Sequence, residues 1–156
     1  MTGVDSPEKL AMMRLLGFDH VINYKQEDFT KNVTRYDLIL DVKTNRSVYN
    51  YTRVLGPDGI YVTVGGSMAR LFQILFLGPW ISMFSKKKLR IVSLKSNKDL
   101  AYMSGLFEVG KLKPVIDGPY KLDEFPKAFK LFADGAHKGK VVINVAYSGF
   151  PDRNKI

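Results

Sequence analysis

Acidic side chains and glycines follow several apolar segments of the sequence, where a parallel sheet would place its ligand-binding loops. These positions are Asp5-Ser6 and the stretches 41–45, 64–67 and 94–97. In open α/β sheets, ligands bind outside the carboxyl ends of the strands. Asp5 could accept hydrogen bonds from ribose hydroxyls there, or it could be an ordinary acid at a helix start. Gly65-Gly66 permits a close backbone approach to a ligand, or it forms a plain tight turn.

Several other chemistries lack the residues that they need. The sequence has no cysteine, which excludes disulfides, thiolate zinc sites, iron–sulfur clusters and a cysteine nucleophile. His20 and His137 lie far apart and outside any HExxH pattern, so we expect no metal site in this chain. No GxGxxG turn precedes a helix, and we assign no catalytic residue. Tyr61, Tyr102 and Tyr120 are interpreted as packing residues.

The order of apolar and helical patterns predicts the fold class. Over residues 1–110, β-branched runs alternate with helical spacing, which favours a doubly wound parallel α/β sheet. Residues 36–42 form a continuous apolar run between acids, typical of a strand covered on both faces. We expect strands at 2–4, 20–23, 36–42, 60–64, 89–94 and 141–145, and helices at 7–16, 26–32, 46–55, 70–84, 97–110 and 125–132.

Local signals predict how individual segments begin and end. Ser6 can cap the first helix, with Pro7 at its first position. Gly56–Gly59 predicts a turn before the strand at 60–64. The helix at 70–84 is expected to break near Gly78-Pro79, and Asn97 is expected to cap the helix after it. Residues 150–156 are expected to be a frayed tail.

The charge of the chain is uneven. The net charge is +9, and the densest basic stretch, residues 86–98, holds six lysines and arginines without an acid. Such a stretch could attract phosphate, nucleic acid or an anionic membrane. We favour a solvated face or an anionic-ligand site, because the aromatic and basic residues do not interleave as they do in single-strand-binding proteins. We therefore expect no nucleic-acid partner.

Membrane and export signals are weak. The start MTGVDSPEKL has no basic region and no apolar core, so we expect no signal peptide. The longest uncharged apolar stretch, 71–84, has fourteen residues, whereas a spanning helix needs about 20. An interfacial helix stays open because Lys86–Lys88 follow directly, although we favour a buried pocket or a subunit-contact helix. We expect a cytoplasmic protein without a membrane span.

The order of five segments resembles the medium-chain dehydrogenase/reductase superfamily. Closest is its zinc-independent quinone-oxidoreductase-like branch, whose members are also described as zinc-type alcohol dehydrogenases. The resemblance rests on GVDSPEKL…LGFDHVINYKQEDF, YDLILDV, LGPDGIYVTVGG, GKLKPVID and GAHKGKVVINV, and it covers residues 2–146 in the family's order.

Family members are substantially longer than this chain. The resemblance therefore implies a partial Rossmann-type sheet without its first strand and glycine-rich turn. It places a partial dinucleotide-binding domain at 1–112, a segment that returns to the GroES-like substrate domain at 113–147, and a tail at 148–156.

The resemblance also implies a nicotinamide cofactor, either NAD or NADP. Asp5, with Ser6 beside it, matches the ribose-binding acid of NAD-preferring members. Lys9 and Tyr24 match positions that hold the 2′-phosphate of NADPH in other members. The two signals conflict, because a carboxylate repels that phosphate.

Seven further positions match the family's cofactor contacts. They are Val42 and Asn45 on the adenine and ribose side, Val64, Gly65 and Gly66 beside the nicotinamide, Asn97 near its amide, and Lys140 at the pyrophosphate. Lys43-Thr44 departs from the family pattern, which often has valine followed by glycine or alanine there.

The function implied is NAD(P)-dependent hydride transfer to or from a carbonyl, an alcohol, a quinone or an enone. This chain would be the C-terminal cofactor-binding portion, inactive alone, acting with a missing N-terminal half or as a homo-oligomer. Two alternatives stay open. One is a catalytically inactive truncated remnant or interaction module, whose sheet would expose strand edges. The other is a basic surface-binding protein.

Overall fold

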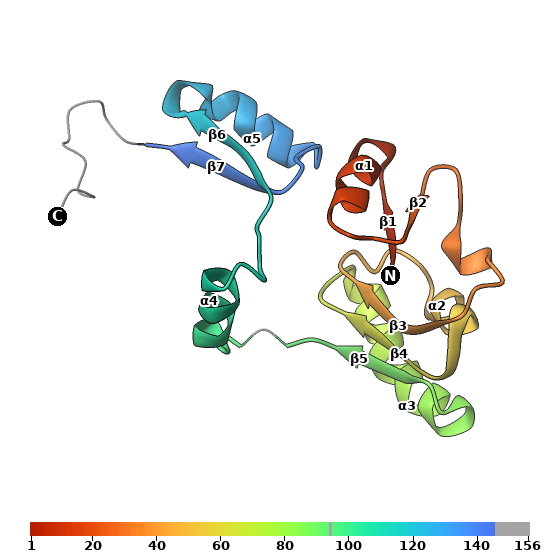
Figure 1. The fold of residues 1–156 in the computed structure, drawn as a ribbon. Coiled ribbons are helices and arrows are strands. Elements are labelled where there is room, and N and C mark those ends of the chain that lie inside the picture. The colour runs from red at the N-terminus through yellow and green to blue at the C-terminus, as the bar shows by residue number, and fades with distance from the viewer. Residues whose placement is uncertain (94, 146–156) are drawn as a thin grey trace. The chain divides into compact units, whose positions relative to one another are not determined.

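The structure is a computed structural model that describes residues 1–93 and 95–145 (Figure 1). It confirms the α/β class. One compact unit holds Met1–Val21 and the chain from Asp99 onward, and the other holds Ile22–Lys98. The elements are β1 (Thr2–Asp5), α1 (Pro7–Leu15), β2 (His20–Asn23), β3 (Tyr36–Asp41), α2 (Val48–Val54), β4 (Leu55–Thr63), α3 (Met68–Ser85), β5 (Lys88–Ile91), α4 (Leu100–Glu108), β6 (Ile116–Lys121), α5 (Phe125–Ala133) and β7 (Lys140–Asn144).

The strands form three separate sheets, ordered β1-β2, β3-β4-β5 and β6-β7. In the three-stranded sheet both pairs are parallel, with Asp41 opposite Thr63 and Thr63 opposite Ile91. The carboxyl ends of these strands therefore lie side by side. The predicted turn at Gly56–Gly59 is an irregularity inside β4, because the pairing with β3 jumps from Leu55 to Ile60.

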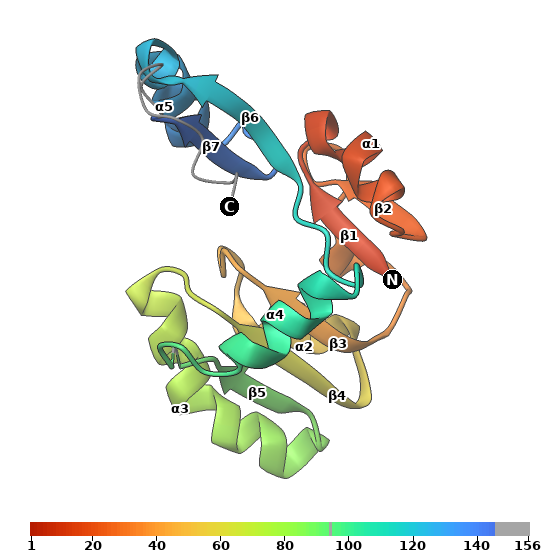
Figure 2. The same cartoon turned by 60° about the vertical axis from the view of Figure 1, so that its left-hand side comes forward.

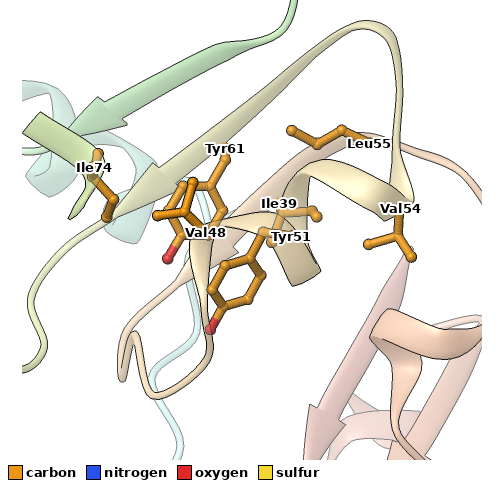
Figure 3. Packing of buried hydrophobic residues seen from close by; sticks show 7 residues of the cluster. All are labelled: Ile39, Val48, Tyr51, Val54, Leu55, Tyr61 and Ile74. Carbon is orange, nitrogen blue, oxygen red and sulfur yellow. The ribbon is translucent and has the colours of Figure 1, made fainter. Parts of the chain in front are cut away.

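One face of this sheet holds the core of the unit (Figure 3). Ile39 and Tyr61 are register partners on that face, and α2 and α3 both pack against it. The views in Figures 1 and 2 agree that α3 runs beside β5. The fully buried Tyr61 ring stacks on Tyr51 with 4.5 Å between centroids and 29° between the ring planes. The buried cluster consists of Ile39, Val48, Tyr51, Val54, Leu55, Tyr61 and Ile74.

The prediction that the strand at 36–42 is covered on both faces is wrong. Leu38 and Leu40 point away from the core and are 61% and 66% exposed, and Val42 after them is also exposed. The reason is that α2 and α3 pack on the same side, that of Ile39. A continuous apolar run shows that both faces of a strand suit burial, but it does not supply the second layer.

The predicted break in the helix at Gly78-Pro79 is also wrong. The helix α3 runs unbroken through Pro79 over 18 residues. A proline inside a helix costs about 3 kcal/mol, and packing of the helix on the sheet, where Ile74 is buried in the core, opposes that cost. By length and composition alone α3 could cross a membrane, a test that core helices of soluble proteins also pass.

Smaller differences concern helix starts and strand ends. Asp99, and not Asn97, stands at the N-cap position of α4, where its side chain makes no capping hydrogen bond, and both residues have left-handed backbone conformations. The helix expected at 26–32 is a single 3-10 turn, Phe29–Lys31, at whose start Asp28 Oδ1 accepts the Thr30 N–H at 3.0 Å. The strand expected at 89–94 ends at Ile91, and Leu94 lies outside the described residues.

In the other unit, α1 packs on β1. Ser6 and Pro7 stand at the predicted positions of the helix start, although the Ser6 side chain makes no capping hydrogen bond. Gly3 allows the close approach, because a Cβ there would lie 2.6 Å from the Phe18 ring. Further along the chain, β6 and β7 are parallel and α5 packs on them through the buried Ala128.

The domain boundaries given by the resemblance, 1–112 and 113–147, stay a prediction, and the expected tails at 148–156 and 150–156 lie outside the described residues.

We expect substitutions on the two faces of β3 to differ sharply in their effect on the free energy of unfolding. Ile39→Ala should lower the free energy of unfolding by about 2–4 kcal/mol, because it leaves a cavity in the core.

The matched change on the bare face, Leu40→Ala, should cost less than about 0.5 kcal/mol. Urea denaturation of both variants measures the difference. A loss for Leu40→Ala as large as that for Ile39→Ala would show that the outer face of β3 is covered in solution.

Candidate functional site

The loops that follow β3 and β4 are held together by two threonine hydroxyls. Thr44, after β3, is buried and its Oγ1 is in hydrogen-bond contact with Thr63 Oγ1 and with the carbonyl oxygen of Gly65. Thr63 Oγ1 also reaches the Gly65 carbonyl oxygen, at 2.6 Å. Each hydroxyl has one proton, so one threonine donates to the other and the second donates to Gly65.

The turn of the second loop depends on a glycine. Gly66 has φ +137°, a conformation that side-chain-bearing residues rarely adopt, and a Cβ there would lie 3.0 Å from the Lys43 carbonyl oxygen and against Thr44. The backbone adds a direct link, because Val64 N–H donates to the Asp41 carbonyl oxygen at 3.0 Å. The two loops therefore form one continuous rim.

The Asp41 carboxylate organises the first loop. Its Oδ1 accepts the backbone N–H groups of Lys43 at 2.9 Å and Thr44 at 3.0 Å, and its Oδ2 accepts the Tyr61 hydroxyl at 2.9 Å. Burial tends to raise the pKa of Asp41. The hydrogen bonds from the Tyr51 hydroxyl, these N–H groups and Tyr61 outweigh burial and lower the pKa below the usual value. Asp41 therefore stays ionised at neutral pH.

The two tyrosines beside Asp41 are held in the protonated form. Burial, together with the charge of Asp41, raises the pKa of Tyr61 to about 12, and the same causes raise the pKa of Tyr51. Both hydroxyls are therefore donors at neutral pH, and neither is suited to release a proton there.

The packing role predicted for Tyr61 agrees with its burial. Tyr102 is instead exposed, and Tyr120 donates to Asp117 at 2.7 Å.

Five of the predicted cofactor residues lie on this rim: Val42, Asn45, Val64, Gly65 and Gly66. The first two follow β3 and the others follow β4. Val42, Asn45 and Val64 present exposed side chains. The structure thus brings these five together, and their role in cofactor binding stays a prediction.

Sequence reasoning missed how the rim is held together. It placed Asp41 and Thr44 in a stretch, 41–45, that could face a ligand, and it noted Thr44 as a departure from the family, but it predicted none of their contacts within the protein. The available signal was the spacing Asp-x-Lys-Thr: a carboxylate commonly accepts backbone N–H groups two residues on in an Asx turn. The buried partner Thr63, contributed by another strand, could not be read from local sequence.

The remaining predicted residues lie at other points of the chain. At the end of β1, Asp5 Oδ1 accepts the Ser6 N–H at 2.7 Å, and Lys9 N–H donates to the Ser6 carbonyl oxygen at 3.0 Å. Tyr24 follows β2 and is exposed, as is Asn97 in the turn before α4. Lys140 is the exposed first residue of β7, and its N–H donates to Val115 at 2.8 Å.

Within residues 1–93 and 95–145, no group of three or more histidine, aspartate or glutamate side chains lies close enough to hold a metal ion. The expectation that this chain holds no metal stays a prediction, because other parts of a longer protein could contribute ligands.

Three comparisons agree on a family. The sequence model of the family described as zinc-binding dehydrogenase matches residues 16–143. The chain is 26% identical to the 2-methylene-furan-3-one reductase of Solanum lycopersicum over 92% of its own length and 33% of that protein. This chain therefore spans well under half the length of that relative.

Solved structures share the fold. A quinone oxidoreductase from Coxiella burnetii matches with a TM-score of 0.70 and 23% identity, over 93% of this chain and 44% of that one. An NAD-dependent alcohol dehydrogenase matches with a TM-score of 0.70 and 20% identity, over 93% of this chain and 43% of that one. Because the family model covers most of the sequence, the chain belongs to the zinc-binding dehydrogenase family.

Proposed function

We propose that this chain is the C-terminal cofactor-binding portion of an NAD(P)-dependent oxidoreductase that transfers a hydride to or from a carbonyl, an alcohol, a quinone or an enone. Family membership supports oxidoreductase chemistry. The observation that carries the proposal is the rim itself: two loops at the carboxyl ends of adjacent parallel strands, fixed to each other by Thr44, Thr63 and Gly65.

The exposed side of the rim suits a flat ring better than a phosphate. A Cβ built on Gly65 would meet nothing within 4 Å, so a ligand can approach the backbone there. Val42 and Val64 present apolar side chains, and Asn45 presents an amide. The charged and hydroxyl groups of Asp41 and Thr63 point inward and are hydrogen-bonded. These features support the proposed positions of the adenine and ribose at Val42 and Asn45 and of the nicotinamide at residues 64–66.

When bound, the nicotinamide ring gives or takes the hydride, and the protein orients the ring and excludes water. Under this proposal, Val42 and Val64 pack against the rings, and the Gly65-Gly66 turn allows the approach. Asp5, whose Oδ1 already accepts the Ser6 N–H, accepts the ribose hydroxyls through its remaining lone pairs.

The choice between NAD and NADP depends on a further group of predicted residues. In an NADP-binding form, Lys9 and Tyr24 would hold the 2′-phosphate. We assign Asn97 to the nicotinamide amide and Lys140 to the pyrophosphate.

Under this proposal, catalysis requires the additional portion found in the longer relatives. We propose that the reaction takes place in the cytoplasm.

A second candidate is a non-catalytic interaction module. The exposed outer face of β3, at Leu38 and Leu40, favours it, because apolar sheet faces commonly mark interaction sites. The two candidates differ in one outcome: only an oxidoreductase portion gives nicotinamide-dependent activity when the rest of the enzyme is supplied.

We expect the isolated chain to bind NADH and NADPH weakly or not at all, because it contains no glycine-rich turn for the pyrophosphate. Titration of NADH fluorescence with the 156-residue chain measures this. Saturable binding at micromolar concentration would contradict the expectation and would mean that the rim alone holds the cofactor.

Asp5→Ser should shift cofactor preference towards NADPH. The test uses a chimera in which the tomato reductase supplies the N-terminal half, and it compares kcat/KM for NADH and NADPH. Removing the carboxylate removes its repulsion of the 2′-phosphate. Asp123→Ser, at an exposed position in the turn before α5, is the control. An unchanged ratio would remove Asp5 from the cofactor site, and a folded but inactive chimera would favour the interaction module.

Asp41→Asn should lower the free energy of unfolding by about 1–3 kcal/mol at pH 7, because the partly buried Thr44 N–H and Tyr61 O–H lose a charged acceptor. The folded state lowers the pKa of Asp41. The ionised Asp41 side chain therefore contributes to the free energy of unfolding above the pKa of about 3.9 that it has in the unfolded chain. This contribution is lost as pH falls through the lower pKa of Asp41 in the folded protein.

Urea denaturation from pH 7 down to acid should show the gap between wild type and Asp41→Asn closing. Asp37→Asn, an exposed acid on the same strand, serves as the control and should cost less than about 0.5 kcal/mol. A gap that widens in acid, or that equals the control, would contradict the role given to Asp41.

A further inference from the structure

The outer side of α3 carries a row of largely exposed aromatic side chains. Only Ile74 and Gly78 of this helix are buried. The side chains that recur at every fourth position, here called the aromatic ridge, are Phe72, Phe76, Trp80 and Phe84. The last three are 66%, 63% and 77% exposed. Such a contiguous exposed patch marks an interaction surface.

The direction of the ridge is fixed by the opposite side of the helix. Ile74 is part of the core with Tyr61, and Gly78 faces β5, where a Cβ would lie 3.6 Å from Leu89. Residues four apart lie on one side of a helix. The ridge rings also stack in pairs, with centroids 6.1 Å apart for Phe72–Phe76 and 6.4 Å for Trp80–Phe84.

The segment that contains the ridge carries charge of one sign. Residues 59–98 contain no acid and seven basic residues: Arg70, Lys86, Lys87, Lys88, Arg90, Lys95 and Lys98. Lys86 ends α3 in a left-handed conformation, and its side chain is exposed, as are those of Lys88 and Arg90. A positive cluster therefore follows directly at the carboxyl end of the ridge.

A groove joins the apolar and the basic parts. It lies between α2 and α3 and has a volume of about 460 Å³. Trp80 and Phe84 line it on the α3 side, and Arg53 and Lys87 are also at its wall. Arg53 donates to the Thr30 carbonyl and Lys87 to the Thr52 carbonyl. These acceptors are neutral, so the bonds position the two cations without cancelling their charge.

We propose that the aromatic ridge and the basic cluster dock this protein on an anionic phospholipid surface. Phenylalanine and tryptophan side chains enter the boundary between headgroups and acyl chains, while lysines and arginines attract anionic headgroups. The groove between α2 and α3 would take a lipid chain against Trp80, with its headgroup near Lys87. The charge complementarity selects an anionic bilayer over an apolar protein surface.

The helix lies on the bilayer and does not span it. Spanning would remove Ile74 from the core and expose Tyr61 and Leu89, whereas docking through the ridge leaves the sheet intact. The 18 residues of α3 extend for about 27 Å at about 1.5 Å per residue, which allows all four ridge side chains to touch one surface at once.

Trp80 is the only tryptophan of the chain, so its fluorescence reports directly on docking. The full chain is mixed with vesicles of phosphatidylcholine, with or without phosphatidylserine. We expect a blue shift of the emission and co-sedimentation with the phosphatidylserine vesicles only. Raising the salt from about 0.1 to about 1 M shortens the Debye length from about 10 to about 3 Å and should release the protein.

Two pairs of variants separate the parts of the surface. Lys86→Glu/Lys88→Glu should lower the partition coefficient about tenfold or more, whereas Lys111→Glu/Lys113→Glu, the same charge change at exposed lysines outside the cluster, should not. Phe76→Ser/Phe84→Ser, which keeps Trp80, should lower it about tenfold or more. Leu38→Ser/Leu40→Ser, on the outer face of β3, should leave it unchanged.

Several results would overturn the proposal. One is the absence of a Trp80 shift with phosphatidylserine vesicles, and another is equal binding to pure phosphatidylcholine. A shift that grows with protein concentration in the absence of lipid, together with a larger sedimentation mass, would assign the ridge to a second copy of the chain. The wild-type measurements decide these points even if a variant fails to fold, and none of them requires cofactor binding.

Discussion

The half-buried carboxylate of Asp41 is the constraint on which the functional end of the sheet depends. It stands at the end of β3. It accepts hydrogen bonds from two backbone N–H groups of its own loop and from the Tyr61 hydroxyl of β4. Thr44, placed by that turn, then reaches Thr63 and Gly65. The polar groups at the strand ends are thus satisfied within the protein, and the rim turns its apolar side chains outward. An inward-directed acid of this kind is a positioning group, and the outward groups around it are those that a cofactor can touch.

The unit that contains the rim exposes two apolar surfaces of different character. On the outer face of the sheet, Leu38 and Leu40 lie on β3, whose partner in the three-stranded sheet is β4 alone. Under the proposed function, the additional portion found in longer relatives covers this face. The aromatic ridge of α3 is instead followed in sequence by lysines, and two of its side chains, Trp80 and Phe84, line the groove between α2 and α3. From these surroundings we propose the rest of an enzyme as the partner of the first surface and a charged lipid surface as the partner of the second.

The sequence allowed the α/β class and the order of elements to be predicted, because β-branched runs and glycine punctuation are local signals. It also placed Val42 and Val64 at strand ends, since those ends follow from the strands themselves. It failed where a distant contact decides the outcome. Pro79 remains helical because α3 packs on the sheet, and Asn97 loses the cap position to Asp99. The link between the two loops could not be foreseen either, because it needs a register between β3 and β4 that no single segment encodes.

The central claim is that β3-β4-β5 is a parallel sheet in which β3 is an open edge. Residue-resolved amide hydrogen exchange of the full chain tests it most directly. The claim predicts slow exchange at residues 60–63 of β4, which are paired with both β3 and β5. It also predicts alternating slow and fast exchange from Leu38 to Asp41, because only every second N–H of an edge strand is paired. Uniform protection along β3 would contradict the claim, since it would mean that this edge is already paired in the chain as it stands.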